Sequence, residues 1–310
     1  MERGCQGIPD LGLMLELAHR SPAETLHLID LPYRLNAWAL RRPENTNLWF
    51  DEAGILRAWA ILNFPSRTFD YVCDPVTSSS LHGQILDWAL GRARSILDHQ
   101  EYADTPSDRR TTWYVNTIQA QKDRTADLLA RGFADQMSVP ADPWSKVFMV
   151  RPADAPLRER LIPPGYRVRR LSGKTDVAAC VRLHRAVFHS LAMIEERRWA
   201  MMLESNYRPE LDLVIEAPDS SLAGFCVGWF DPVGYSGRPG GQIEPMGVSE
   251  QHRRLGLSKI LMNECFRWMA ALGAEQIYLE TDSYRPEAIA LYESVGFRVL
   301  HQVHVFRKDF

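Results

Sequence analysis

Apolar and polar positions in the C-terminal half alternate in a way that predicts strands and helices in turn. Short apolar or alternating runs bounded by Gly, Pro, Asp and Ser predict strands. Apolar residues spaced three and four apart predict helices. On this basis we expect strands over residues 166–171, 211–216, 222–230, 242–248, 276–281 and 297–307, and helices over 175–189, 193–203, 257–272 and 286–294.

The N-terminal half repeats this order more weakly. Strand-like runs cover 48–51, 55–64, 69–73 and 112–116, and helical patterns cover 81–97 and 123–130. The last helix of each half ends at a Gly-Phe pair, Gly132-Phe133 and Gly296-Phe297. We interpret the chain as two copies of one αβ fold. The alternative is two unrelated αβ domains.

A proline-rich stretch separates the halves. Residues 151–165 contain Pro152, Pro156, Pro163 and Pro164. Because proline removes a backbone donor and fixes φ, this stretch is typical of a linker. A length of 310 residues suits two domains. We therefore predict domains at 1–150 and 166–310, with a linker at 151–165.

Composition excludes several classes of protein. Hydrophobic residues make up 45% and charged residues 24%, as in globular proteins, and the net charge of −3 gives no reason to expect a nucleic-acid partner. The five cysteines lack the paired spacing of disulfide frameworks or zinc sites, so no metal is expected. No apolar run approaches the 20 or so residues of a membrane span, and Met1 to Cys5 lacks the apolar core of a signal peptide. We expect a cytoplasmic protein that does not bind membranes.

The most informative stretch is a short loop between a predicted strand and a predicted helix. The first N–H groups of a helix have no internal partner, and the helix dipole adds positive charge there, so such a junction suits a phosphate. Gly256 lets the backbone approach an anion closely. The stretch contains neither GxGxxG nor GxxxxGK[ST], which argues against a dinucleotide fold and a nucleotide P-loop. Its residues are Arg253, Arg254, Leu255, Gly256, Leu257, Ser258 and Lys259.

Two motifs in this order resemble the GNAT superfamily of acyl-CoA-dependent N-acetyltransferases. Arg253-x-x-Gly256-x-Ser258 is similar to the loop that cradles the CoA pyrophosphate in that family, and Leu291-Tyr292-x-x-x-Gly296-Phe297 is similar to its later helix. The resemblance covers roughly 166–310. It implies an α/β protein of two GNAT-like domains, each a mixed, mostly antiparallel sheet flanked by helices. It also implies acetyl-CoA or another acyl-CoA as co-substrate, bound by residues 253–259.

The run from Glu244 to Val248 resembles the strand that GNAT enzymes place beside the acetyl group. This resemblance implies that backbone groups of Met246, Gly247 and Val248 bind the pantetheine arm between two splayed strands. Two positions depart from the family pattern. Ser258 replaces a usual glycine or alanine, and Arg285 stands where asparagine is common, from which it could reach a CoA phosphate.

Acyl transfer to an amine needs a base and an acid. An alkyl amine has a pKa near 10 in water, so a base must accept its proton before or during attack. Glu244 is the candidate base, directly or through a water; alternatively, it is a surface carboxylate or an arginine's partner. Tyr292 is the candidate acid for the CoA thiolate; alternatively, it only packs against Ala288 and Val295.

The N-terminal half lacks the corresponding loop. Residues 74–80 read Asp-Pro-Val-Thr-Ser-Ser-Ser, with no arginine or glycine and with Asp74 positioned to repel a phosphate. Leu128-Leu129 stands where the C-terminal half has Leu291-Tyr292. This organisation is similar to tandem GNAT proteins such as mycothiol synthases and some antibiotic-modifying enzymes. We expect a degenerate N-terminal copy.

The sequence thus predicts an enzyme that transfers an acetyl or other acyl group from acyl-CoA to a primary amine. We expect a small-molecule amine as acceptor and a monomer or homodimer. The sequence does not identify the acceptor or the acyl chain. The alternative from another class is a non-catalytic acyl-CoA sensor or scaffold.

Overall fold

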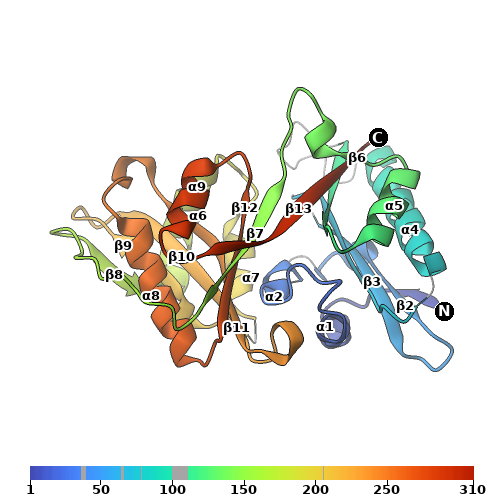
Figure 1. Cartoon of the computed structure of the whole chain (residues 1–310), viewed down its shortest axis with the longest axis horizontal. Helices are drawn as coiled ribbons and strands as arrows, with labels where there is room; N and C mark the ends of the chain where they lie inside the picture. The colour runs from blue at the N-terminus through green and yellow to red at the C-terminus, as the bar shows by residue number, and fades with distance from the viewer. Residues whose placement is uncertain (36–39, 64–65, 78, 100–110, 205) are drawn as a thin grey trace.

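The computed structural model describes the chain except residues 36–39, 64–65, 78, 100–110 and 205 (Figure 1). In the described part of the chain, thirteen strands form one mixed sheet that runs through both halves. Their order is β1-β2-β3-β4-β5-β13-β7-β12-β11-β10-β9-β8, with β6 paired to β13. Helices flank this sheet in each half (Figure 1). The predicted α/β class is confirmed.

The C-terminal half follows the predicted order of elements. Helices α6 and α8 cover opposite faces of its sheet, because Cys226 packs with α8 whereas its neighbours Phe225 and Val227 pack with α6. The elements are β8 (Arg167–Arg170), α6 (Lys174–Phe188), α7 (Glu195–Met202), β9 (Asp212–Glu216), β10 (Leu222–Asp231), β11 (Gly240–Val248), α8 (Leu257–Ala271), β12 (Gln276–Asp282), α9 (Pro286–Glu293) and β13 (Arg298–Asp309).

The N-terminal half also matches the predicted strands and its two later helices. The pattern did not indicate two helices near the start of the chain, α1 (Leu11–Arg20) and the short α2 (Leu31–Arg34). It also missed the strands β1 (Glu2–Gly4), β6 (Ala134–Asp135) and β7 (Lys146–Pro152), and Phe64 of the predicted strand 55–64 lies outside the described residues. Helix α1 packs on β3, where Trp59 is 1% exposed and donates to the carbonyl of Met14. The other elements are β2 (Thr46–Phe50), β3 (Leu56–Asn63), β4 (Thr68–Cys73), α4 (Ser79–Asp98), β5 (Thr112–Ile118) and α5 (Lys122–Ala130).

The two halves exchange strands. β7 follows α5 as β13 follows α9, so each is the last strand of its own half. Yet β7 pairs with β12 along its whole length, and β13 pairs with β5 from Val303 to Asp309. The two exchanged strands also pair with each other, which joins the two sheets into one. The green and red arrows of β7 and β13 run side by side where the halves meet (Figure 1).

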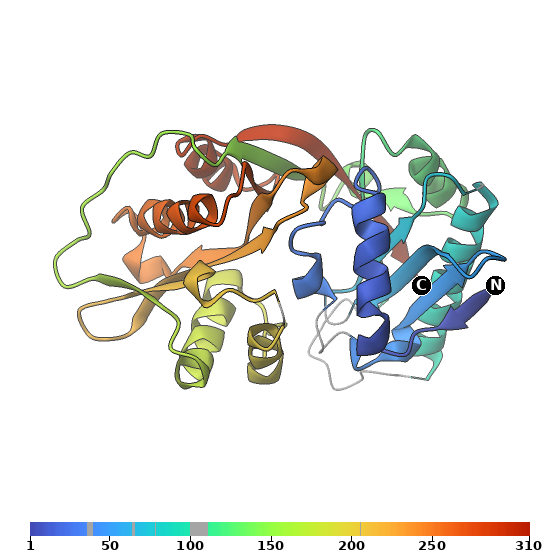
Figure 2. The ribbon, with the colours of Figure 1, turned by 90° about the horizontal axis from the view of Figure 1, so that it is seen from below.

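The predicted linker is partly strand. Residues 151 and 152 belong to β7, and Arg151 is fully buried with its guanidinium 4.1 Å from the ring centroid of Phe266. The following residues, up to 166, contain no helix or strand. Figure 2 shows this green segment passing around the orange helix α8 before it enters β8.

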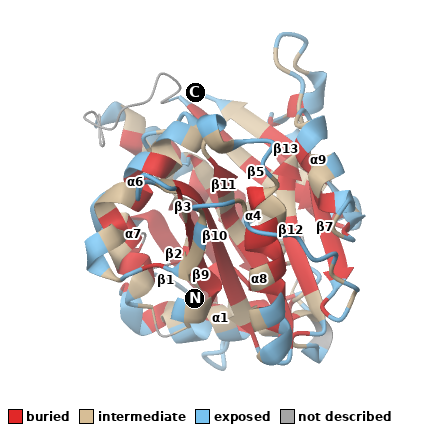
Figure 3. Ribbon diagram, turned by 90° about the vertical axis from the view of Figure 1, so that its left-hand side faces the viewer, coloured by how far each residue is buried: buried red, intermediate tan, exposed pale blue. Residues whose placement is uncertain are grey.

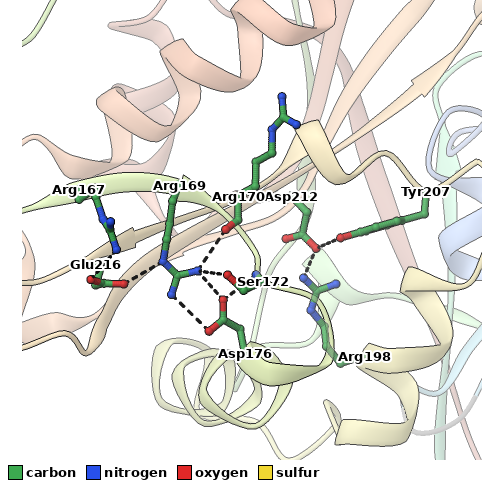
Figure 4. Close-up of polar contacts among 9 residues, drawn as sticks. All are labelled: Arg167, Arg169, Arg170, Ser172, Asp176, Arg198, Tyr207, Asp212 and Glu216. Carbon is green, nitrogen blue, oxygen red and sulfur yellow. Dashed lines mark hydrogen bonds and ion pairs between the residues drawn. The ribbon is translucent and has the colours of Figure 1, made fainter.

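Buried strands and polar anchors together fix the C-terminal sheet. In Figure 3 the strands are mostly buried, and the helices expose their outer faces. Arg169 of β8 donates to Glu216 of β9 at 2.9 Å and also pairs with Asp176 of α6 (Figure 4). Arg198 of α7 forms a buried ion pair with Asp212, which also accepts from the Tyr207 hydroxyl at 2.7 Å (Figure 4). A buried charge with no partner is costly, so this pair fixes α7 on β9.

Candidate active site

Strands β11 and β12 separate in the middle of the C-terminal sheet. They pair in parallel only from Gly240 to Gln242 and from Gln276 to Tyr278. On its other edge β11 carries a bulge, because Glu244 and Pro245 together lie opposite the single residue Val227 of β10. A bulge turns side chains out of the regular alternation. The splayed strand pair implied by the resemblance is therefore present.

The separated strands enclose a cavity of about 170 Å³. Glu244 on β11 and Tyr292 on α9 both line it, although 48 positions separate them in the sequence. The structure thus brings together the two residues expected to be base and acid. The other lining residues are Lys146, Phe188, Ile243, Pro245, Met246, Leu279, Glu280, Thr281, Asp282 and Arg285.

The environment of Glu244 suits proton transfer near neutral pH. Burial raises the pKa of its carboxyl to about 7, while the positive charge of Arg34 opposes this and the carboxylates of Asp30 and Glu280 add to it. Its main chain is fixed, since the Trp229 indole donates to the Glu244 carbonyl at 2.7 Å. A carboxylate with a pKa near the working pH is an effective general base.

Glu280 lines the same cavity, but its pKa is lowered, whereas the pKa of Glu244 is raised. Burial would raise its pKa, but Lys146, His27 and Arg34 together lower it to about 2. Lys146 donates to Glu280 at 2.7 Å. Two carboxyls whose pKa values are pushed apart can take different roles, one moving a proton and one remaining charged.

The Tyr292 hydroxyl remains protonated at neutral pH. Burial raises its pKa to about 12, with Arg285 opposing and Glu244 adding to the shift. The ring is 9% exposed and packs edge-on against Phe297, at 6.1 Å between centroids. No described residue forms a hydrogen bond with the hydroxyl, so its proton is free to donate into the cavity.

The loop before α8 has the backbone geometry of an anion site. Arg254 and Gly256 have positive φ, 65° and 78°, and Gly256 is the N-cap of α8. Across the described backbone, no carbonyl accepts from the N–H groups of residues 254 to 258. Successive unpaired N–H groups in such a turn form a concavity that binds phosphate.

The side chains of this loop differ in their exposure and in their hydrogen bonds. Arg253 donates to Glu250 at 3.2 Å and to the Val248 carbonyl at 3.4 Å. Leu255 is 46% exposed, whereas Leu257 is buried at 1% and anchors the helix. Ser258 and Lys259 are half-buried on the first turn. The loop thus presents mainly backbone donors and cations.

The remaining expected residues lie along β11 and at the start of α9. Met246 lines the 170 Å³ cavity, and so does Arg285, the N-cap of α9. Gly247 allows α6 to approach, because a Cβ there would lie 2.5 Å from Val187. Val248 pairs with Gly224 on β10. Among the described strands, none pairs with β11 on its β12 side beyond Gln242.

Sequence reasoning missed the contribution of the N-terminal half. Lys146 reaches the cavity because β7 is exchanged into the C-terminal sheet. His27 lies 3.5 Å from Glu280, and Asp30 binds Arg34 at 3.0 Å. Of these residues, Glu280 alone had a local sequence signal for a role in the site, because it is a carboxylate within the predicted strand 276–281. The others come together only through contacts between distant segments.

Helix α2 packs near the candidate base through Tyr33. The ring of Tyr33 stacks on Trp229, at 5.4 Å between centroids, and Trp229 holds the Glu244 main chain. The guanidinium of Arg197 on α7 lies over the Tyr33 ring, 5.8 Å from its centroid. Residues of both halves therefore surround the region next to Glu244.

The equivalent place in the N-terminal half is filled. β4 and β5 pair in parallel at one position, Thr68 with Tyr114, and the space beside them is a cavity of only about 40 Å³. The chain's own Thr25, Leu26 and His27 line it, with Arg34. A bound molecule would have to displace these side chains.

The turn before α4 also differs from the loop before α8. Asp74 accepts from the Val76 N–H at 3.1 Å and from Arg57 at 2.8 Å, so a carboxylate occupies the place where the other half has free donors. The expectation for residues 74–80 includes Ser78, which lies outside the described residues.

Known proteins share this sequence pattern and fold. Residues 177–297 match the family model "Acetyltransferase (GNAT) family". This region therefore belongs to the GNAT family, and the resemblance inferred from the motifs is confirmed.

Two curated relatives match parts of the chain. Mycothiol acetyltransferase of Propionibacterium freudenreichii subsp. shermanii is 26% identical over 159 residues, half of this chain and half of the relative. Probable N-acetyltransferase family 8 member 5 of Mus musculus is 37% identical over 62 residues. That match covers 20% of this chain and 27% of the relative, so the chain spans half or less of both proteins.

Two solved structures share the fold over the whole chain. A GCN5-related N-acetyltransferase from Sphaerobacter thermophilus has a TM-score of 0.65 at 20% identity, covering 100% of this chain and 95% of that one. A tandem GNAT protein from the clavulanic acid biosynthesis pathway has a TM-score of 0.64 at 14% identity, covering 100% and 97%. The chain therefore shares its fold, over its whole length, with both proteins.

None of the described helices is long and apolar enough to cross a membrane. The described side chains include no group of three or more His, Cys, Asp or Glu placed to hold a metal ion.

Proposed function

We propose that this protein transfers an acetyl or other acyl group from acyl-CoA to a primary amine. One observation carries the proposal: Glu244 and Tyr292 line the same cavity between the splayed strands. The free N–H groups at residues 254–258 give the phosphates of acyl-CoA a place to bind, and this fit supports it as co-substrate.

The proposed mechanism is direct attack of the amine on the thioester. Glu244 accepts a proton from the ammonium form or during attack, because its pKa of about 7 keeps a large fraction ionised at neutral pH. Tyr292 donates its hydroxyl proton to the departing sulfur. The backbone of Met246, Gly247 and Val248 holds the pantetheine arm along the open edge of β11, and Arg253 to Lys259 hold the pyrophosphate.

We propose a small-molecule amine as acceptor, bound where α2 and β12 meet Glu244. Glu280 and Asp30 lie near this place, but each is paired with a cation, Lys146 and Arg34 respectively, so these charges give no preference for a charged acceptor. One relative is named a mycothiol acetyltransferase, which supports acetyl transfer as the reaction. In this proposal residues 1–150 are a degenerate copy without a CoA loop, 151–165 a linker and 166–310 the catalytic domain, in a monomer or homodimer of the cytoplasm.

A thiol-release assay with acetyl-CoA and longer acyl-CoAs, run across a panel of small amines, tests this proposal. We expect amine-dependent release of CoA with at least one amine, and mass spectrometry should find the acylated amine. Tight acetyl-CoA binding with no amine-dependent release by the wild type, and no effect of Glu244→Gln or Tyr292→Phe on any rate, would instead favour the non-catalytic acyl-CoA sensor.

A further inference from the structure

A second, larger cavity lies between the first turns of α8, the end of α9 and the linker. Its volume is about 640 Å³. Lys259 and Asn263 of α8 form one wall, and Ser294 to Gly296, just beyond α9, form another. The third wall is the linker, including Arg158 and Arg160.

This cavity and the 170 Å³ cavity both border α9 and the residues that flank it. Arg285 and Tyr292 face the smaller one, whereas the residues after the helix face the larger one. The loop at Gly256 adjoins the larger cavity, since a Cβ on Gly256 would lie 3.5 Å from the Arg160 guanidinium. A long molecule with its thioester in the smaller cavity and its pyrophosphate at the loop would reach the larger cavity with its remaining end.

The larger cavity is lined by three cations and by no carboxylate. Burial lowers the pKa of Lys259, and the charges of Arg160 and Arg158 lower it further. Neither arginine forms an ion pair with a residue that the structure describes. The nearby Glu159 is already paired with Arg267 of α8 at 2.7 Å.

The linker backbone is fixed at this place. The Asn263 side chain donates to the Arg158 carbonyl at 3.0 Å, and the Glu159–Arg267 pair lies next to it. These contacts hold the linker at Arg158 and Glu159 against α8, and Arg160 follows directly. Clustered like charges are unfavourable without an anion, so the arrangement points to an anionic ligand.

We infer that Arg158, Arg160 and Lys259 bind the 3′-phosphate on the ribose of acyl-CoA. This inference rests on the proposed function, because it requires that the thioester end lie between β11 and β12. It assigns a binding role to the segment that joins the two halves. Arginine suits a phosphate because its planar guanidinium donates two hydrogen bonds to one group.

The test compares acetyl-CoA with its 3′-dephospho form by calorimetry on the full chain. We expect Arg158→Ala/Arg160→Ala to raise the Kd for acetyl-CoA about tenfold or more, since each exposed ionic contact contributes several-fold. The Kd for the dephospho ligand should change less than about twofold in the same variant. Arg182→Ala removes an exposed arginine of α6, on the other face of the sheet, and should change neither Kd.

Other results would overturn either the 3′-phosphate assignment alone or the proposed function as well. An equal loss of affinity for both ligands, or no loss for acetyl-CoA, would overturn the 3′-phosphate assignment while leaving the proposed function intact. A wild-type protein that binds neither ligand would overturn the proposed function and this inference with it. Circular dichroism of each variant shows whether the fold is retained.

Discussion

Lys146, on the last strand of the N-terminal half, donates to Glu280 of β12 at 2.7 Å inside the candidate active site. The contact exists because β7 and β13 are exchanged between the halves. The N-terminal half is thus part of the site in two ways, through β7 and through α2.

The strand exchange predicts that an isolated C-terminal half is defective. A fragment of residues 164–310 lacks β7, which leaves β12 as an unpaired edge along seven residues, and such an edge promotes aggregation. We expect low soluble yield or loss of acceptor affinity. The matched control is a fragment of residues 141–310, which retains β7 and should be more soluble and have a higher Tm. A soluble, fully active 164–310 fragment would show that the exchange is dispensable.

The pKa of Glu244 predicts the pH dependence of activity. The ionised carboxylate is the active form, so kcat/KM should fall as the pH drops below about 7. Glu244→Gln should lower kcat and remove this acidic limb. The measurement is a pH–rate profile of both proteins with a single amine. An acidic limb that persists unchanged in the variant would assign it to another group.

Loss of the Tyr292 hydroxyl should affect chemistry and leave binding intact. Tyr292→Phe keeps the packing against Phe297, so we expect little change in the Kd for acetyl-CoA. Turnover should fall by roughly 10- to 1000-fold, the range expected for a general acid. Single-turnover kinetics with saturating acetyl-CoA measure this. Full turnover in a folded variant would leave the ring with a packing role alone.

Two glycines that flank α8 form a matched pair for testing the phosphate loop. Gly256 before the helix and Gly273 after it both have positive φ, 78° and 94°, so both Gly→Glu changes strain the backbone similarly. Only Gly256→Glu places a carboxylate among the free N–H groups. We expect it to abolish acetyl-CoA binding, and Gly273→Glu to retain it. Equal affinity in the two variants would contradict the loop assignment.

Local patterns predicted the elements well. The amphipathic spacing that ends with Leu272 gave α8, and the strand before it gave β11 within two residues. The loop at Gly256 was predictable because a strand, a turn and a helix follow each other directly in the sequence.

What the sequence could not reveal is which strand pairs with which. Lys146 and Glu280 are 134 positions apart, and alternation within β7 is the same whichever half receives the strand. The same holds for α2, whose Tyr33 reaches Trp229 only in the folded chain. The arginines of the linker also gave no pattern, since their role depends on the path around α8.

The central claim is that the chain has one working acyl-CoA site, in its C-terminal half. The filled cleft beside β4 and the carboxylate of Asp74 both oppose a second site. Calorimetric titration of acetyl-CoA into the full chain tests this most directly. We predict a stoichiometry of one per chain, falling to zero in Gly256→Glu; a stoichiometry of two, or one that persists in that variant, would contradict the account.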